Sequence, residues 1–201
     1  TMAPSLLVLA HAQGAFGMFE NQTEAELAAL VQTNLVAPML LIRGLLPLLE
    51  AQPEAAVVAV GSTFGALAFP GFAGYSASKF GLRGLVEALG REYADGSVRF
   101  QYLSPRATRT AFNTPAVDAL NAELKTAQDQ PGDVAAQLLA AIRRGDRRRQ
   151  LGWPEKLFAR LNGVFPALID RALRGQLPIV RRHAGATPSV TPEKTHEIAS
   201  H

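Results

Sequence analysis

One stretch of the chain, VVAVGSTFGALAFPGFAGYSASK at residues 57–79, restricts the possible fold most strongly. Its first four residues form an unbroken apolar run, which is typical of a strand that is covered on both faces. The run stops at Gly61, so Ser62 is expected at the carboxyl end of that strand. Ligands of open α/β sheets bind at this edge. The stretch therefore predicts an α/β fold with a ligand site beside Ser62.

The same stretch ends on a predicted helix over residues 74–90, with Leu82, Leu85, Val86 and Leu89 on its apolar face. Tyr75 and Lys79 are four residues apart, so they share one side of this helix. A free phenol titrates near ~10, and an ammonium group one turn away favours the phenolate and lowers that pKa. We therefore expect Tyr75 to exchange a proton with a substrate oxygen that the Ser62 hydroxyl holds. The YxxxK pattern and a strand-end serine are each common, and only their combination carries this interpretation.

Three segments together resemble the short-chain dehydrogenase/reductase family. They are Ser62 with YSASK at 75–79 and the following FGLRGLVEALGREY, QTNLVAPMLLIRGLLPLL at 32–49, and LSPRATRT at 103–110. The similarity covers about residues 6–112 closely and the rest loosely. It implies a Rossmann-like, doubly wound parallel sheet, of which this chain would hold the C-terminal part with extra C-terminal helices.

The resemblance implies an NAD(P)-dependent oxidoreductase that interconverts an alcohol and a ketone or aldehyde. Tyr75 would donate or accept the proton, Lys79 would lower its pKa and bind the nicotinamide ribose, and Ser62 would orient the carbonyl. Asn34 would hold a water in a proton relay to Lys79, although a mid-helix Asn also occurs as a surface or helix-packing residue. The cofactor would be NAD or NADP, and the residues that select between the two would lie outside the matched segments.

Further cofactor contacts follow from the same resemblance. Thr108 and Thr110 match family positions that meet the nicotinamide carboxamide. His11 and Ala12 stand where the family ends its Asn-Asn-Ala-Gly motif, and we expect them beside the cofactor; a satisfied histidine at a strand end is the alternative for His11. A second departure is Pro105-Arg106 in place of Pro-Gly. Because Arg takes positive φ less readily than Gly, that turn is expected to differ.

The family's Gly-rich turn, which holds the pyrophosphate, has no counterpart in the given sequence. The sequence begins where the family's fourth strand would begin, so we expect an N-terminal half outside it. A truncated chain is the other possibility, and it favours a non-catalytic, nucleotide-binding or scaffold protein of this fold. Serine acyl transfer is a weak third hypothesis, because the S-x-x-K at 76–79 lacks the companion SDN and KTG motifs.

The loop after Ser62 is aromatic. Phe64, Phe69 and Phe72 predict an apolar substrate, unless these rings belong to the core. Residues 113–131 are polar, Ala-rich and irregular in period, and in the family this region is the mobile lid over the substrate.

The remaining elements follow from periodicity and capping. Thr23 and Glu26 form a capping box at the start of a helix that runs to about Glu50. The other expected elements are a buried strand at Ser5–Ala10, a strand at Val98–Leu103, a helix at Asp133–Arg144, a short last strand within 143–153, and short helices at Glu155–Asn162 and Pro166–Leu173. Residues 1–185 would form one domain, and residues 186–201 a loose polar tail.

Composition limits the partners. The chain has no Cys, no second His or carboxylate stands at ligand spacing from His11, and a metal site is not expected. No apolar run reaches the ~18 residues of a membrane span. Residues 141–185 hold eleven Arg or Lys against three Asp or Glu, although the net charge is only +3. This region is either a solvated helical surface or a patch facing an anionic membrane; a nucleic-acid motif is not found. We expect a cytoplasmic protein, either free or peripheral to a membrane.

The two long helices predict self-association. Residues 24–50 and 74–93 carry apolar residues beyond one core-facing stripe, and such helices need a second partner. In the family, the corresponding helices pair across a two-fold axis, so the resemblance implies a homodimer or homotetramer.

Overall fold

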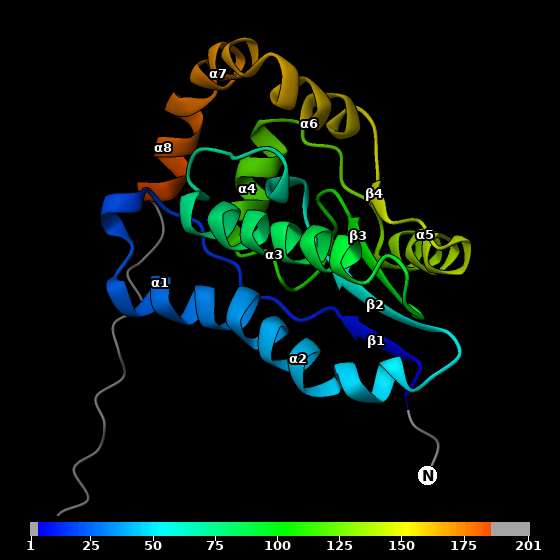
Figure 1. Ribbon diagram of the computed structural model, residues 1–201. Coiled ribbons are helices and arrows are strands. Elements are labelled where there is room, and N and C mark those ends of the chain that lie inside the picture. Colours follow the sequence, from blue (N-terminus) through cyan, green and yellow to red (C-terminus); the bar gives the residue numbers. More distant parts are fainter. Residues whose placement is uncertain (1–3, 186–201) are drawn as a thin grey trace, which may run out of the picture.

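A computed structural model describes residues 4–185 of the chain (Figure 1). The strands are β1 (Leu6–Leu9), β2 (Ala55–Val60), β3 (Val98–Ser104) and β4 (Arg148–Gln150). The helices are α1 (Glu24–Val31), α2 (Ala37–Glu50), α3 (Ala73–Glu92), α4 (Pro115–Glu123), α5 (Pro131–Arg144), α6 (Glu155–Val164), α7 (Pro166–Arg174) and α8 (Leu177–Gly185). A π-helical turn, η2 (Gln32–Val36), joins α1 to α2, and short 3₁₀ turns occur at η1 (Phe19–Asn21) and η3 (Thr63–Gly65). The prediction placed the helices that frame the site at nearly these bounds.

Within residues 4–185, four parallel strands form one sheet in the order β1-β2-β3-β4. Val57 of β2 lies between Leu7 of β1 and Phe100 of β3. Parallel neighbours require crossovers, and helices supply them. All carboxyl ends therefore meet at one edge, where the segments after Val60 and Ser104 begin.

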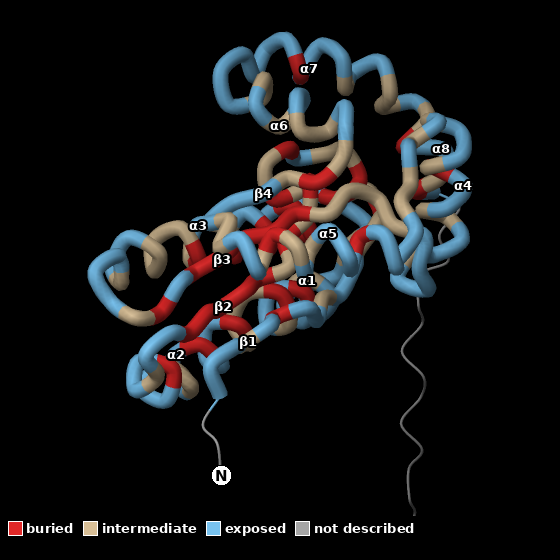
Figure 2. The backbone as a smooth tube through the Cα atoms, turned by 90° about the vertical axis from the view of Figure 1, so that its right-hand side faces the viewer, coloured by how far each residue is buried: buried red, intermediate tan, exposed pale blue. Residues whose placement is uncertain are grey.

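Both faces of β2 are covered, which explains its unbroken apolar sequence. Val57 and Ala59 pack in a core with Ile42 of α2 and with Leu82 of α3. Their neighbours Ala56 and Val58 lie in a separate cluster with Leu103 and with Ala141 of α5. Figure 2 shows the buried residues concentrated along β2 and β3. Helices on both faces of a parallel sheet confirm the predicted Rossmann-like α/β class.

The expectation that Ser5–Ala10 forms a buried strand is wrong for most of its residues. Leu6 is 48% exposed and Val8 is 45% exposed, whereas Leu9 is buried. Leu7 and Leu9 pack on the α2 face of the sheet. Among the described elements, β1 pairs only with β2, and α5 packs on the more distant β3. An apolar run predicts a strand, but it cannot reveal that the strand lies at a sheet edge.

Two helices in the second half of the chain, α4 and α8, were not predicted. Residues 113–131 contain α4, whose start is marked by Thr114, because its side chain accepts a hydrogen bond from Val117 N at 3.3 Å. Pro115 occupies the first helical position, as is common. Helix α8 packs against α4, and α6 packs against α7. Figure 1 shows α6, α7 and α8 in succession, passing over the side of the molecule that holds α4. The expected tail at 186–201 lies outside the described residues.

The helix through Glu24–Glu50 is long and apolar enough to cross a membrane by length and composition alone. Core helices of soluble folds pass the same test, and Leu30, Ile42 and Leu49 of this helix are buried in the protein. Its outer side nevertheless exposes large apolar residues, namely Val31, Met39, Leu40, Leu41 and Leu48. Exposed apolar residues of this kind are what the predicted self-association through this helix requires.

Candidate active site

Ser62 lies just after β2, at the carboxyl edge of the sheet, where the sequence places it. It has extended backbone angles and begins the short turn η3, and its Oγ accepts a hydrogen bond from Phe64 N at 3.1 Å. The local sequence favours this arrangement because Ser is a good cap for a turn that leaves free backbone N–H groups. The hydroxyl is thereby fixed at the end of the strand.

Tyr75 lies in the first turn of α3 and is buried. Its ring faces Phe64 edge-on, with 6.3 Å between ring centres, and lies 6.3 Å from the ring of Phe112. Burial raises the pKa of Tyr75, and the Ser62 hydroxyl lowers it by a smaller amount. The prediction that Lys79 holds the pKa of Tyr75 below its usual value is therefore wrong. A buried phenol resists ionisation because its phenolate is desolvated.

Lys79 is only 1% exposed, which is rare for a lysine without a carboxylate partner. Its Nζ lies 5.8 Å from the centre of the Tyr75 ring and donates a hydrogen bond to Val60 O at 3.3 Å. Burial lowers the pKa of Lys79 to about 8. An ammonium has three donors, and among the described residues Val60 O is the acceptor for Lys79. Donors therefore remain for hydroxyl groups of a ligand, as a nicotinamide ribose would require.

Asn34 is buried within η2, and both its side-chain oxygen and its side-chain nitrogen are hydrogen-bonded. Its Oδ1 accepts from Gln13 N at 2.7 Å, while its Nδ2 donates to Gln13 O at 2.9 Å and to Ser78 Oγ at 3.1 Å. Ser78 Oγ in turn donates to Tyr75 O at 2.8 Å. Asn34 thus links the segment after β1 to the first turn of α3. The sequence analysis missed Ser78, although its place beside Lys79 on a buried helix was a usable signal.

A cavity of about 560 Å³ opens at this edge of the sheet. Ser62 and Tyr75 line it, together with Thr108 and Thr110 after β3. His11 is exposed and, like Ala12, Asn34 and Lys79, is not among the residues that line this cavity. The structure therefore brings the hydroxyl groups of the predicted site together in one cavity, with Lys79 and Asn34 behind them.

The three predicted substrate residues form an aromatic wall of this cavity. The ring of Phe64 lies 4.8 Å from that of Phe72 and 5.5 Å from that of Phe69. Residues that the sequence analysis did not single out complete the lining, chiefly Phe112, Val117, Leu120, Phe158, Ile169 and Leu173. They come from α4, α6, α7 and the segment before α4. Val117 and Leu120 lie in the 113–131 region that the resemblance implies as a lid over the substrate. No local pattern indicated that α6 and α7 also reach the cavity.

Side chains that could act as metal ligands do not gather in the part of the chain that the structure describes. There, no group of three His, Cys, Asp or Glu side chains lies close enough together to bind a metal ion. Besides hydroxyl groups, the cavity lining includes the charged side chains of Arg106, Lys125 and Glu155.

Comparison with known proteins gives the same picture as the geometry. A family model described as short chain dehydrogenase matches residues 5–121. The oxidoreductase claN of Passalora fulva is 37% identical over 98 residues, which are 49% of this chain and 45% of that protein. The chain spans about half the length of the curated relatives it matches.

Two solved structures resemble the fold. A short-chain dehydrogenase from Streptomyces avermitilis has a TM-score of 0.69 at 28% identity, covering 86% of this chain and 71% of that one. A short chain dehydrogenase from Burkholderia cenocepacia in complex with NADP has a TM-score of 0.72 at 19% identity, covering 84% and 68%. Since the family model spans more than half of the chain and includes Asn34, Ser62, Tyr75 and Lys79, the chain belongs to the short-chain dehydrogenase family.

Proposed function

We propose that this protein is an NAD(P)-dependent oxidoreductase that interconverts an alcohol and a ketone or aldehyde on an apolar substrate. The observation that carries the proposal is the shared cavity, in which the hydroxyls of Ser62 and Tyr75 stand against a wall of Phe64, Phe69 and Phe72. A cavity that is mostly apolar, with a few convergent polar groups, is the usual form of a small-molecule site. Membership of an oxidoreductase family supports the reaction class.

In this proposal, Tyr75 and Ser62 act on one substrate oxygen. The Ser62 hydroxyl donates a hydrogen bond to the carbonyl oxygen, and Tyr75 transfers a proton to it. Because burial raises the pKa of Tyr75, its phenol is protonated at neutral pH and suits proton donation to a carbonyl. Asn34 contributes by fixing the first turn of α3 through Ser78, in addition to the water relay that the resemblance implies.

The cofactor would be NAD or NADP, which supplies the hydride when bound. Lys79 would bind its ribose hydroxyls through the donors that Val60 O leaves free. Thr108 and Thr110, which line the cavity, would meet the carboxamide end. His11 and Ala12, at the end of β1, would border the cofactor from outside the cavity.

We further propose that the helices α6 and α7 lie against an anionic membrane, which places the protein in the cytoplasm at a membrane surface. On these helices and next to them, large apolar residues are exposed: Trp153 just before α6, Leu157, Val164, Phe165 between the helices, and Leu168. The exposed basic side chains of Arg160, Arg171 and Arg174 stand among them. Apolar residues with basic residues between them suit an anionic interface. Phe158 and Leu173 of the same helices line the cavity, so a lipophilic substrate would enter from the membrane side.

The test of the proposed reaction is turnover by the full-length protein, followed by nicotinamide absorbance. Neutral ketones and aldehydes of increasing chain length would be compared with carboxylate-bearing analogues of equal length. The proposal expects kcat/KM to rise with apolar length and to stay low for the charged analogues. Turnover that is absent for all carbonyls and alcohols, or restricted to charged ones, contradicts it.

A further inference from the structure

Arg106 stands where the family resemblance leads one to expect Gly, directly after Pro105 at the end of β3. Among the described non-glycine residues, only Lys125 has a positive φ, so the turn at Arg106 avoids the left-handed conformation that a glycine would permit. The turn therefore accommodates a long side chain without a positive φ at Arg106. The sequence analysis had expected only that this turn differs from the family's. The question is what this side chain does there.

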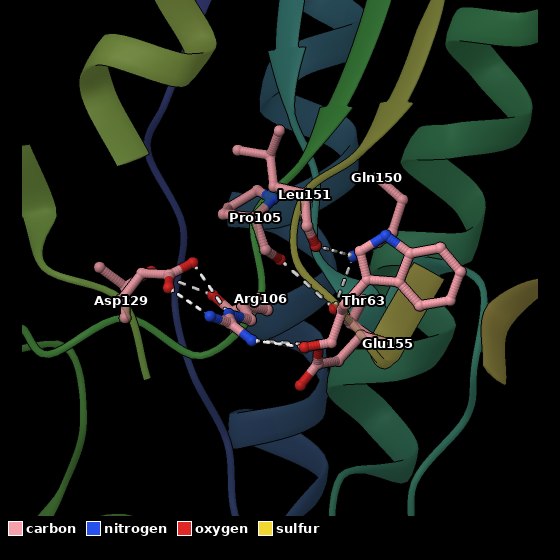
Figure 3. A network of polar contacts seen from close by, with 9 residues as sticks. Thr63, Pro105, Arg106, Asp129, Gln150, Leu151 and Glu155 are labelled. Carbon is pink, nitrogen blue, oxygen red and sulfur yellow. Dashed lines mark hydrogen bonds and ion pairs between the residues drawn. The ribbon is translucent and has the colours of Figure 1, made fainter. Parts of the chain in front are cut away.

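The guanidinium of Arg106 joins two segments that are far apart in the sequence (Figure 3). Its Nε and Nη2 donate to the two carboxylate oxygens of Asp129 at 2.9 and 2.6 Å. Its Nη1 donates to Trp153 O at 2.8 Å and lies 3.5 Å from Glu155 Oε2. All three charged side chains are mostly buried. A bidentate contact of this kind fixes orientation as well as distance.

The backbone beside Arg106 is shaped to admit this side chain. Gly152 has φ +85°, and a Cβ at that position would lie 2.4 Å from Arg106 Cδ. Any larger residue at 152 would therefore displace the arginine or the turn that precedes α6. The close approach shows that the 152–155 segment packs directly on the stem of Arg106, beyond its polar contacts.

Each segment held by Arg106 carries part of the cavity. Asp129 N donates to Ala107 O at 2.9 Å, and Arg109 N donates to Asp129 O at 3.0 Å, so the Asp129 segment brackets Thr108. On the other side, Glu155 is the first residue of α6, and Phe158 of that helix lines the cavity. Arg106 itself also lines it. One side chain thus lies between the predicted cofactor segment and the helices that close the cavity.

We propose that Arg106 is a positioning residue that holds α6 and the Asp129 segment against the end of β3 and thereby sets the width of the apolar cavity. Its charge is compensated by Asp129 and Glu155, so it does not act as a binding site for an anionic substrate. Removing the guanidinium leaves the two mostly buried carboxylates of Asp129 and Glu155 without the cation that both contact, and their uncompensated charge drives α6 outward.

Hydrogen exchange of the full-length protein tests this proposal without any substrate. In Arg106→Gln, the amides of α6 and α7 should exchange faster than in the wild type, while those of β2 and β3 keep their protection. Asp129→Asn should have the same local effect. Arg106→Lys should be intermediate, since an ammonium keeps the charge but lacks the planar fork. Arg109→Gln is the matched control, because the Arg109 side chain is exposed, and it should change nothing.

A kinetic measurement gives the second readout and rests on the proposed function. In Arg106→Gln, KM for an apolar carbonyl should rise roughly tenfold while kcat changes little, as expected when binding is lost uniformly. Unchanged exchange of α6 and α7 in both Arg106→Gln and Asp129→Asn overturns the proposal. A faster exchange in all elements alike also overturns it, since that is global destabilisation. If the wild type shows no turnover, the proposed function is contradicted, but the role of Arg106 is not. The hydrogen-exchange comparison then decides the role of Arg106 by itself.

Discussion

Asn34 Nδ2 donates to Ser78 Oγ at 3.1 Å, which ties the π-helical turn η2 to the helix that carries Tyr75 and Lys79. The same hydroxyl donates to Tyr75 O at 2.8 Å, so a single buried serine connects Asn34 to the backbone of Tyr75. A π-helical turn inside a longer helix is rare and is frequently found at functional sites. Here it places an amide at the junction of three segments of the site.

Ser78→Ala tests this connection. The change leaves one buried Nδ2 proton of Asn34 without its acceptor, and an unsatisfied buried polar group costs about 1–3 kcal/mol. Tyr75 O loses the bond from the Ser78 hydroxyl but keeps its helical hydrogen bond within α3. We expect the free energy of unfolding, measured with denaturant, to fall by that amount. Ser76→Ala is a matched control in the same helix, because Ser76 Oγ is buried and has no hydrogen-bond partner among the described residues. It should leave stability unchanged or raise it. Equal losses in the two variants would refute the structural role of Ser78.

Lys79 should make stability depend on pH. Burial lowers its pKa from 10.5 to about 8, so between these values the unfolded chain binds a proton that the folded chain has released. Stability therefore rises with pH over this window, by up to about 1.4 kcal/mol per pH unit. Above pH ~10 the tyrosines oppose the trend, because the pKa values of Tyr75 and Tyr102 are raised and the unfolded tyrosines lose their protons first.

Replacement of Lys79 isolates this contribution. In Lys79→Met the rise in stability between about pH 8 and 10 should disappear. Lys79→Arg should lack it too and be less stable throughout, because a buried guanidinium cannot discharge. Denaturant unfolding at a series of pH values gives the comparison. A wild type and a Met variant with parallel pH profiles would mean that Lys79 is not a desolvated ammonium.

The exposed sides of the long helices should mediate self-association. Leu40, Leu41 and Leu48 of α2 and Phe80 of α3 are exposed apolar residues, which a second partner would cover. The sequence also favoured Leu45, Leu82 and Leu85 for this surface, but Leu82 is buried in the core and the other two pack against it. We expect the full-length protein to be a homodimer or homotetramer by light scattering, and Leu41→Glu to dissociate it. Leu139→Glu, an equally exposed position on α5, should leave it assembled. A monomeric wild type at tens of micromolar would exclude this interface.

The membrane proposal predicts lipid binding through α6 and α7. The protein should co-sediment with anionic vesicles, release at high salt as charges are screened, and bind less in an Arg160→Ala, Arg171→Ala double variant. The sequence alone suggested Arg181 and Arg182 for this change, but Arg182 bonds to Glu123 and its loss would disturb the α4–α8 contact. Trp153, the single tryptophan and 64% exposed, should shift its emission to the blue on binding. Equal absence of binding to neutral and anionic vesicles would contradict the membrane proposal and leave this region as a solvated helical surface.

Local patterns predicted much of this fold. The apolar run of β2, the spacing on α3, and the Thr23–Glu26 capping box each encode their element within a few residues, and the structure contains all three. The exposure of Leu6 and Val8 was not predictable in this way, because it depends on which elements flank β1. The start of α4 was encoded by Thr114-Pro115 and was overlooked within a polar, irregular segment.

The site was predictable only as far as its motif. Ser62, Tyr75, Thr108 and Thr110 do line one cavity, since strand ends of a parallel sheet meet at one edge. The direction in which the pKa of Tyr75 shifts could not be predicted from the sequence. It depends on how deeply the phenol is buried and not on the four-residue spacing to Lys79. The contacts of Arg106 with Asp129 and Glu155 depend on tertiary approach, and no sequence spacing encodes it.

Tyr75→Phe tests the central claim, that Tyr75 is the acid–base group, most directly. The variant keeps the buried ring and removes the titrating hydroxyl, and its matched control is Tyr93→Phe, a tyrosine at the far end of α3 that packs on Phe100. The measurement is kcat of the full-length protein for a carbonyl substrate of the wild type, with the thermal midpoint recorded alongside. We predict that Tyr75→Phe loses most of its turnover, by roughly 10²-fold or more as expected for a lost general acid, with little change in midpoint, while Tyr93→Phe keeps its turnover. A Tyr75→Phe enzyme with near-normal turnover would contradict the account.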